Sequence, residues 1–599
     1  MPEDPSASQW KKFVRIKRPT VKHVRVRARK IEGATTRHAH RFIISRWANL
    51  RDVRRHALGW LVLAGLLVVA TGLQLFWIQD AYSSRQAVSE GTYAEGVIGR
   101  IDTVNPIYAS TQSERSASYL IFSSLFRYDG SNHLEGDLGL TWKQADEGKT
   151  YTVQMRKDAK WHDGKPVTAH DVEFTLRLIK NPQTRSYLRG TWQNVQVRAT
   201  SAYELEFKLP SPYAPFPHAL TFGVLPKHIL ETVSPVRLRE HPFNREPLGS
   251  GPFRFRSIQI INPDADRVVL QVEKNEEYYR GQTKLDRFQL HTYEDHDALR
   301  QGFLSREINA ANELTSADIR TIKEHAPSTV INDAPIYDGV YAFLKTDSPM
   351  LTDVAVRRSL VKATNRSALR KVVDGYASPL EGPLIAQQVN GIEELKQPAF
   401  DAAAARSDLE KAGWVLKNGV REKDGTPLVL NVVAPRLGDF PDLLGELAKQ
   451  WRSIGVDVKT QVVDTDTFEQ NIIKPRAYDV LVSEIALGVD PDVFAYWHSS
   501  QASVFGLNLS DYRSGVADDA LLSARSRSEP ELRQAKYLGF VSQWHEDAPA
   551  VALFQPHLRY VSTDNTHAID PSSPVVDTLN RYHRLSQWTV SIDSQFKTP

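Results

Sequence analysis

The chain has 599 residues, a net charge of +4 and an apolar content of 41%, and it contains no cysteine. The lack of cysteine excludes disulfide bonds, thiolate metal sites, cysteine nucleophiles and a lipid-modified N-terminal cysteine. A chain of this length exceeds what one hydrophobic core usually serves, so two or more folded lobes are expected.

Residues 57–78 form an apolar stretch in which only Thr71 and Gln74 are clearly polar. About 20 apolar residues are enough to cross a bilayer as a helix. Trp60 and Trp77 lie near the two ends of the stretch, where aromatic rings favour the lipid–water boundary. We therefore expect a transmembrane signal-anchor helix at residues 57–79. A buried core helix, the alternative, is usually shorter and has a polar face.

The charge is distributed unevenly about this stretch. Residues 1–57 carry 16 lysines and arginines against 4 acidic residues, whereas the remainder carries 59 against 67. Basic residues that flank a first span stay in the cytoplasm. Residues 1–56 are therefore expected to form a largely disordered cytoplasmic tail, followed after the span by a stalk at 80–92 and an extracellular or periplasmic domain. A basic tail of this kind could also bind nucleic acid. Contact with anionic lipid explains its positive charge instead, so no nucleic-acid partner is expected.

The residues after the stalk alternate between apolar runs and amphipathic segments. Strands are predicted at 268–273, 428–433 and 478–487, and helices at 353–373, 401–414, 440–455 and 530–549. Strands that alternate with helices of this length predict mixed α/β lobes rather than a sandwich.

Residues 150–176 (TYTVQMRKDAKWHDGKPVTAHDVEFTL) predict a strand, a turn and a helix. Asp163 and Gly164 form a strong turn dipeptide, because glycine accepts positive φ. Thr168 is a candidate helix N-cap, and Asp171 three positions later completes a capping box.

His162 and His170 in the same segment are also possible metal ligands. Each has a sufficient structural role, in the turn or in the first helical turn, and no third ligand lies nearby in the sequence. No metal site and no cofactor are therefore expected.

The segment WHDGKPVTAHDVEFTL resembles the peptide/nickel class of extracellular solute-binding proteins, the oligopeptide- and dipeptide-binding components of ABC importers. The likeness continues in order over most of residues 93–565. It is found at 120–130 (LIFSSLFRYDG), 247–255 (PLGSGPFRF), 274–288 (KNEEYYRGQTKLDRF), 353–369 (DVAVRRSLVKATNRSAL), 409–414 (LEKAGW) and 486–501 (ALGVDPDVFAYWHSSQ).

This resemblance implies a two-lobed, periplasmic-binding-protein-like α/β clamshell with a hinge, in which a peptide or related solute is captured between the lobes. Lobe I would comprise residues 93–288 and 556–599, and lobe II residues 289–555. The captured solute would pass to an ABC permease and its ATPase, and no catalytic residues are implied. Nickel chelates and other non-peptide ligands are alternatives within the family.

The expected pocket departs from the family pattern. In the peptide-binding members an Asp four residues before a Pro grips the peptide's amino terminus, and a Trp precedes that Asp. Counted back from Pro491, the Trp position is Glu484 and the Asp position is Leu487. Glu484, Asp490 and Asp492 are the carboxylates available near this strand end.

Other candidate contacts are aromatic side chains and one glycine in segments that border the pocket in relatives. Rings give wide apolar contact at small entropic cost, and Gly488 allows close approach of a ligand backbone. The aromatic candidates are Tyr128, Tyr278, Tyr279, Tyr496 and Trp497.

Two rival functions remain. A membrane-anchored extracellular hydrolase lacks support, because the chain has no G-x-S-x-G elbow, no H-E-x-x-H helix and no P-loop. A tethered receptor would keep the fold without transport.

Overall fold

The computed structural model describes residues 54–87, 91–263, 267–567, 575–590 and 592–596. The chain divides into two compact units, with the boundaries after Gln86 and after Asp593. The smaller unit contains helix α2 (Arg54–Tyr82). Strands β1 (Ser83–Ala87) and β23 (Ile592–Phe596) pair with each other, and each contains one of the two boundaries.

The predicted span at 57–79 falls within α2, and the described apolar side chains from Leu58 to Leu73 are exposed. Among the residues whose side chains are described, no helix combines the length and the apolar character needed to cross a membrane. Most of the predicted tail, residues 1–53, lies outside the described residues.

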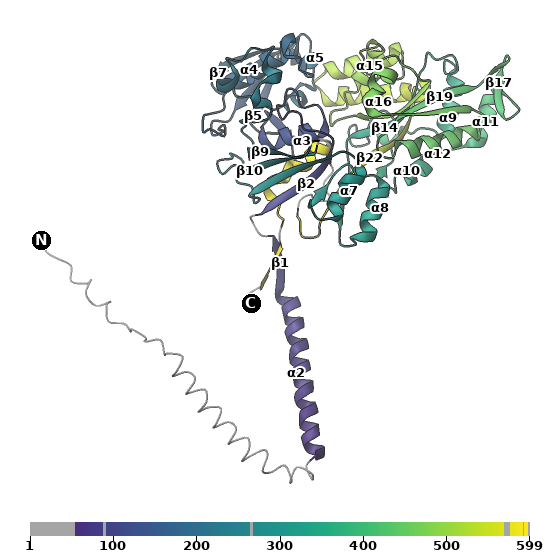
Figure 1. The fold of residues 1–599 in the computed structure, drawn as a ribbon. Coiled ribbons are helices and arrows are strands. Elements are labelled where there is room, and N and C mark those ends of the chain that lie inside the picture. The colour runs from purple at the N-terminus through teal and green to yellow at the C-terminus, as the bar shows by residue number, and fades with distance from the viewer. Residues whose placement is uncertain (1–53, 88–90, 264–266, 568–574, 591, 597–599) are drawn as a thin grey trace, which may run out of the picture. The chain divides into compact units, whose positions relative to one another are not determined.

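The larger unit is organised around a 12-stranded sheet (Figure 1) and also contains smaller sheets of two, three and four strands. We call residues 91–335 together with 556–590 the first lobe, and residues 336–555 the second lobe. In the first lobe, parallel strands β2 and β11 are extended by antiparallel β10 and β9. Their bounds are β2 (Thr92–Ile98), β9 (Phe253–Asn262), β10 (Arg267–Lys274) and β11 (Arg287–Tyr293).

A four-stranded antiparallel sheet with helix α4 (Ala169–Lys180) also belongs to the first lobe. Its strands are β5 (Gly139–Ala145), β6 (Thr150–Met155), β7 (Gln196–Ser201) and β8 (Glu204–Lys208). The hairpin β3 (Phe126–Tyr128)–β4 (Leu134–Gly136) and helices α3 (Gln112–Ile121), α5 (Arg189–Trp192), α6 (Lys227–Leu230), α7 (His296–Leu304) and α8 (Ser316–His325) complete this lobe.

The second lobe places β21 between β19 and β14. Buried side chains on both sides of these strands form two clusters, one against α12 and one against α16. The strands are β14 (Asp338–Leu344), β19 (Val429–Pro435), β20 (Asp457–Val463) and β21 (Val480–Ala486). The helices are α9 (Val354–Lys362), α10 (Arg366–Val372), α11 (Ala402–Lys411), α12 (Phe440–Arg452), α13 (Thr465–Phe468), α14 (Phe494–Trp497), α15 (Gly515–Ser526) and α16 (Pro530–Asp547).

Two neighbouring strands join the lobes. β22 (Ala550–Ser562) pairs through its first half with β14 and through its second half with β13 (Val330–Pro335). Because β13 leads directly into β14 and both pair with β22, the two chain connections between the lobes lie side by side. There Tyr337 N donates a hydrogen bond to Val576 O (3.1 Å). β12 (Ala310–Ala311) and β15 (Ala377–Ser378) also pair with β22.

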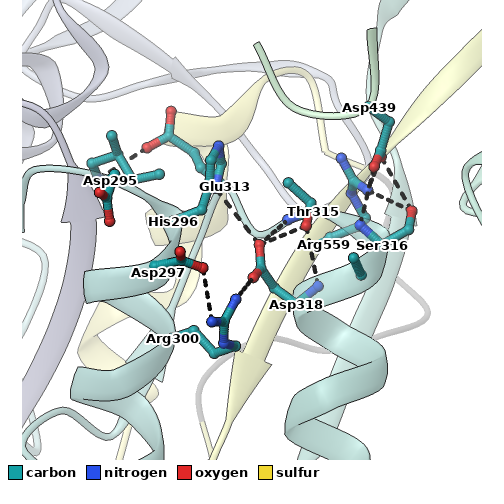
Figure 2. Close-up of polar contacts among 12 residues, drawn as sticks. Asp295, His296, Asp297, Arg300, Glu313, Thr315, Ser316, Asp318, Asp439 and Arg559 are labelled. Carbon is teal, nitrogen blue, oxygen red and sulfur yellow. Dashed lines mark hydrogen bonds and ion pairs between the residues drawn. The ribbon is translucent and has the colours of Figure 1, made fainter. Parts of the chain in front are cut away.

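A group of charged side chains surrounds the N-termini of α7 and α8 (Figure 2). We call it the α7–α8 polar cluster. Arg300 pairs with Asp297 (2.7 Å) and with Asp318, whose carboxylate also completes the capping box of α8. Asp439, at the start of α12, accepts hydrogen bonds from Ser316 and pairs with Arg559 of β22. The cluster thus ties α8 to both lobes.

The first lobe also buries an ion pair completely. Arg581 Nη2 lies 2.6 Å from Glu95 Oε1, and both side chains are inaccessible to solvent. The hydroxyls of Tyr560 (2.8 Å) and Tyr582 (2.7 Å) donate to the same carboxylate. Since a buried charge requires such partners, the C-terminal segment is an integral part of this lobe.

Candidate functional site

A cavity of about 760 Å³ lies in the first lobe. Helix α3, the β3–β4 hairpin, residues 187–192 and the C-terminal segment 579–587 contribute to its wall. The volume falls within the roughly 300–1,000 Å³ typical of pockets that enclose organic ligands.

Charged groups on one wall of the cavity form a fixed network. Glu135 Oε1 accepts hydrogen bonds from Arg127 (2.8 Å) and Arg280 (2.7 Å). Asp137 accepts from the Tyr279 hydroxyl (2.7 Å), and burial raises the pKa of Asp137. Two guanidinium groups therefore share the Glu135 carboxylate and also act on Asp137, so the charged groups of this wall hold one another in place.

Two carboxyl groups of the second lobe face each other at the ends of β14 and β21. The antiparallel register places Val340 opposite Glu484, so Asp338 and Glu484 lie diagonally on one face. Their carboxyl groups are within hydrogen-bonding reach. Loss of solvation raises the pKa of both, that of Asp338 well above its ordinary value, although only Asp338 is half-buried and the side chain of Glu484 remains exposed. We call Asp338 and Glu484 the acidic pair.

No cation compensates the acidic pair directly. Within the described part of the chain, neither carboxylate forms an ion pair with a lysine, arginine or histidine. Two arginines act on the pair only through space: Arg115, which lines the cavity, lowers the pKa of Asp338, and Arg559 lowers that of Glu484. Each is itself paired with another carboxylate, Arg115 with Asp577 (3.3 Å) and Arg559 with Asp439.

The other two candidate carboxylates have cationic partners. Arg533 Nη2 contacts both oxygens of Asp490 (2.7 and 2.9 Å), and the side chain of Asp490 is 11% exposed. Arg525 Nη2 lies 2.9 Å from Asp492, whose pKa is raised by burial and lowered in part by that arginine. Of the three predicted acids, only Glu484 lacks a cationic partner among the described side chains.

Leu487 and Gly488 follow the end of β21. Both backbone N–H groups donate to Tyr337 O (2.9 and 3.0 Å), at the crossing between the lobes. The side chain of Leu487 is buried in the second lobe. Gly488 has φ +68°, a left-handed conformation that favours glycine. These residues hold the strand end in place through backbone hydrogen bonds to the segment where the chain crosses between the lobes.

Three of the predicted aromatic residues lie beside the cavity or near Asp490. Tyr278 lines the cavity. Tyr279 is bound to Asp137, and the guanidinium of Arg156 lies 4.2 Å from its ring. The hydroxyl of Tyr128 lies 2.9 Å from His218 Nδ1. Burial, with smaller effects of Asp577 and Asp490, raises the pKa of Tyr128.

The remaining two aromatic candidates belong to α14. Tyr496 is half-buried and donates to Ala486 O (2.8 Å), and burial raises the pKa of its phenol to about 12. Trp497 is completely buried, with its ring against Tyr341 and Trp544. Trp497 therefore packs in the core of the second lobe and does not face the cavity.

His162 joins two of the sequence motifs. Gly249 N donates to its Nδ1 (3.3 Å), and its Nε2 lies 3.2 Å from Gly251 O. Burial lowers the pKa of His162 to about 4, so the ring is neutral near pH 7. Both glycines pack against the carbonyl of Ile121, where a Cβ would lie under 3 Å from backbone.

Among the described residues, no three histidine or acidic side chains are grouped so as to hold a metal ion. The predicted capping box is present: Asp171 Oδ2 accepts from Thr168 N (2.8 Å) and Thr168 Oγ1 (2.9 Å).

The sequence reasoning missed Asp338, Arg115, Arg525 and Arg533. Asp338 opens an apolar strand, DGVYAFL, and an acid at the first position of a buried strand is a usable signal. No comparable signal marks the arginines, because they pair with carboxylates 33 to 462 positions away.

Known proteins resemble this chain over most of its length. The oligopeptide-binding protein AppA of Bacillus subtilis is 27% identical over 516 residues, covering 84% of this chain and 93% of AppA. The structure of AppA with a nonapeptide matches with a TM-score of 0.69 at 25% identity, over 84% of this chain and 100% of AppA. NikZ of Campylobacter jejuni with Ni(L-His) matches with a TM-score of 0.71 at 25% identity, over 83% and 99%.

The family model described as bacterial extracellular solute-binding proteins, family 5 Middle, matches residues 133–505. With the fold and cavity described above, this match shows that the chain belongs to the bacterial extracellular solute-binding proteins of family 5.

Proposed function

We propose that this protein captures peptides outside the cytoplasmic membrane and delivers them to an ABC permease. The observation that carries the proposal is the cavity of about 760 Å³, in a chain that aligns with 93% of the oligopeptide-binding protein AppA. A cavity of this volume encloses an organic solute of several residues rather than a bare ion. The fold supplies binding and hinge motion, and we assign no catalytic residue.

The solute's positively charged group binds at the acidic pair. Asp490 and Asp492 are neutralised by Arg533 and Arg525, whereas the half-buried Asp338 and the exposed Glu484 repel each other. An ammonium group between the two carboxylates would remove that repulsion. Glu484 and Asp338 thus take the role that the aspartate at the position of Leu487 has in peptide-binding relatives. Tyr278 and the backbone near Gly488 complete the proposed contacts.

The hinge lies at two chain crossings. We place it at Ile336–Tyr337 and at Gln555–Pro556, where β13–β14 and β22 pass between lobes. This moves the first lobe boundary from residue 288 to about 335, because α7 and α8 pack with Val561 and Ala94 in one cluster. Closure of the lobes around solute is the form that a permease would recognise.

Helix α2 anchors the protein with residues 1–56 in the cytoplasm. The support is the basic tail beside an apolar stretch whose side chains from Leu58 to Leu73 are exposed. A reporter fused before Arg54 should read as cytoplasmic, and the C-terminus should be accessible to protease on intact cells. A mature N-terminus found between Gln79 and Ala94 would overturn the anchor.

The peptide function is tested with the full-length protein in detergent. Calorimetric titration with tetrapeptides should show saturable binding, and a ligand at about a hundred times its Kd should add about 2.7 kcal/mol to the unfolding free energy. Ni(L-His) is the competing solute. Binding of Ni(L-His) without binding of any peptide would overturn the peptide assignment. Unchanged peptide uptake in a deletion strain would overturn the role in transport.

A further inference from the structure

Three polar side chains form a hydrogen-bonded series at the crossing between the lobes. Ser378 Oγ lies 2.7 Å from His557 Nε2, and His557 Nδ1 lies 2.5 Å from Asp333 Oδ1. Ser378 is on β15 in the second lobe, whereas His557 on β22 and Asp333 on β13 belong to the first lobe. We call these three residues the hinge triad.

Strand pairing brings the hinge triad to one face of the sheet. Ser378 lies opposite Gln555 of β22, and Asp333 lies opposite Arg559 of the same strand. His557 is two positions from each of these partners, and alternate residues of a strand share a face. The register of β22 therefore fixes the order serine, histidine, aspartate.

The order of contacts matches the roles in a Ser–His–Asp triad. An ionised carboxylate only accepts hydrogen bonds, so Asp333 fixes a proton on Nδ1 of His557. Nε2 is then an acceptor, and the hydroxyl of Ser378 donates to it. The side chain of His557 is 11% exposed, and Ser378 is half-buried. The imidazole is thus shielded from competing water, while the serine remains in contact with solvent.

Another serine–histidine contact in the chain lacks this order. Ser500 Oγ lies 2.9 Å from His498 Nδ1, but Ser500 N donates to the same nitrogen (3.0 Å). Asp518 lies 3.9 Å from Nε2, beyond hydrogen-bonding distance. Since a neutral ring nitrogen has one lone pair, Nδ1 of His498 is already occupied and does not take the proton of Ser500. Ser500 is therefore a matched control for Ser378.

The neighbours of Ser378 limit the chemistry that it supports. Pro379 follows it and has no N–H, so the backbone donor that often follows a nucleophilic serine is missing. Tyr376 supplies a side-chain donor near the triad: burial, and then the Asp333 carboxylate, raise the pKa of its phenol. A neutral phenol donates one hydrogen bond. With one such donor for a developing oxyanion, the site suits acyl donors that have good leaving groups.

We propose that Ser378 is a nucleophile, activated by His557 and Asp333, that is acylated by small esters with good leaving groups. Ser378 Oγ attacks the ester carbonyl, its proton passes to His557 Nε2, and this proton leaves with the departing alcohol. Water then attacks the acyl carbon and gives a proton to His557. That proton returns to Ser378 Oγ as the carboxylic acid is released. Solute capture itself requires no catalytic residue, so this activity is independent of the peptide function.

Labelling with a fluorophosphonate locates the nucleophile. The full-length protein in detergent is incubated with the reagent, and the modified residue is identified by mass spectrometry. We expect labelling of the parent at Ser378, an equal rate in Ser500→Ala, and a rate at least about tenfold lower in His557→Gln and Asp333→Asn, because general-base catalysis contributes roughly 10²–10⁴-fold. Absence of label from Ser378 in the parent, or an unchanged rate in His557→Gln, would overturn the proposal.

The absence of cysteine from the chain permits a second measurement. Ser378→Cys and Ser500→Cys each introduce a single thiol, whose rate of reaction with iodoacetamide is measured at neutral pH. Ser378→Cys should react at least about tenfold faster although Ser500 is the more exposed residue, because an adjacent imidazole favours the thiolate.

Adding His557→Gln to Ser378→Cys should remove this advantage, and thermal unfolding of all the variants should match that of the parent. Equal reaction rates of the two thiols would show that the hinge triad only ties the lobes together, and would overturn the proposal. Neither result depends on whether peptides bind, so the peptide function stands or falls separately.

Discussion

The α7–α8 polar cluster and the acidic pair contain the same kinds of side chain but differ in their partners. In the cluster, Asp318 and Asp439 pair with Arg300 and Arg559 and also bind helix N-termini or a neighbouring serine (Figure 2). Asp338 and Glu484 face each other, and the pKa of both is raised. The carboxylates of the cluster are held by arginines, whereas those of the acidic pair have no ion-pair partner among the described side chains, which is why we propose them as the solute contacts.

The largest expected effect is on stability, and it tests whether the α7–α8 polar cluster holds the fold together. Asp318→Ala removes the capping box of α8 and one partner of Arg300, and the side chain of Asp318 is only 4% exposed. We expect the unfolding free energy to fall by about 2–3 kcal/mol, with peptide affinity unchanged. Denaturant unfolding and calorimetric titration measure the two quantities. A large loss of affinity at unchanged stability would make the cluster part of the binding site.

The next effect tests the acidic pair. Asp338→Asn combined with Glu484→Gln should weaken binding of a free-amine tetrapeptide by about thirtyfold or more, because hydrogen bonds to charged groups contribute about 1.5–3 kcal/mol. The N-acetylated peptide should bind both proteins equally. Asp490→Asn is the matched control, since Asp490 is held by Arg533. Equal affinity of the parent for free and acetylated peptides would show that the amine is not recognised here.

The pair also predicts a pH dependence. Its raised pKa values mean that the folded state binds protons more tightly than the unfolded state. In the free protein, the contribution of the pair to stability is therefore complete below about pH 4 and is lost as the pH rises through the raised pKa. A cationic peptide requires the deprotonated pair, so its affinity should increase over the same window by up to about tenfold per pH unit. Titrations from acidic to neutral pH should show this slope, and Asp338→Asn with Glu484→Gln should flatten it.

The smallest effect sharpens the comparison with a second capping box. Thr168 and Asp171 cap α4 as Thr315 and Asp318 cap α8, but Asp171 has no arginine partner in the described structure. Thr168→Ala should therefore lower the unfolding free energy by only about 1 kcal/mol. Thermal unfolding checks the size, and peptide affinity should not change. A loss as large as that of Asp318→Ala would show that capping, rather than ion pairing, dominates at both sites.

Local sequence patterns predicted most of the elements. The strands expected at 268–273 and 428–433 correspond to β10 (Arg267–Lys274) and β19 (Val429–Pro435), and the helix expected at 440–455 corresponds to α12 (Phe440–Arg452). The single helix expected at 353–373 is instead two, α9 and α10, because Asn365 caps a new start. Periodicity identifies such elements, since it depends on neighbours within one or two turns.

The residues of the candidate site are harder to predict from local sequence patterns, because their chemistry depends on pairs of residues that are far apart in the sequence. Glu484 was correctly located on a strand end, but its partner Asp338 is defined only by the register of β14 against β21. Asp490 is an equal candidate by sequence position, and only its pairing with Arg533, 43 positions later, distinguishes it from Glu484. Trp497 is an aromatic residue of the kind that often contacts ligands. Only its packing against Tyr341 shows that it lies in the core.

The buried pairing of Glu95 with Arg581 has a consequence for synthesis. The two residues stand 486 positions apart, and at about 5–20 residues per second the ribosome needs roughly 25–100 s to add the intervening chain. Throughout that time the carboxylate has no arginine to meet, and β13 has no β22 to pair with. The N-terminal half therefore cannot complete its fold during translation. A chain that stops short of Arg581 leaves the Glu95 carboxylate without the arginine that it meets in the finished fold.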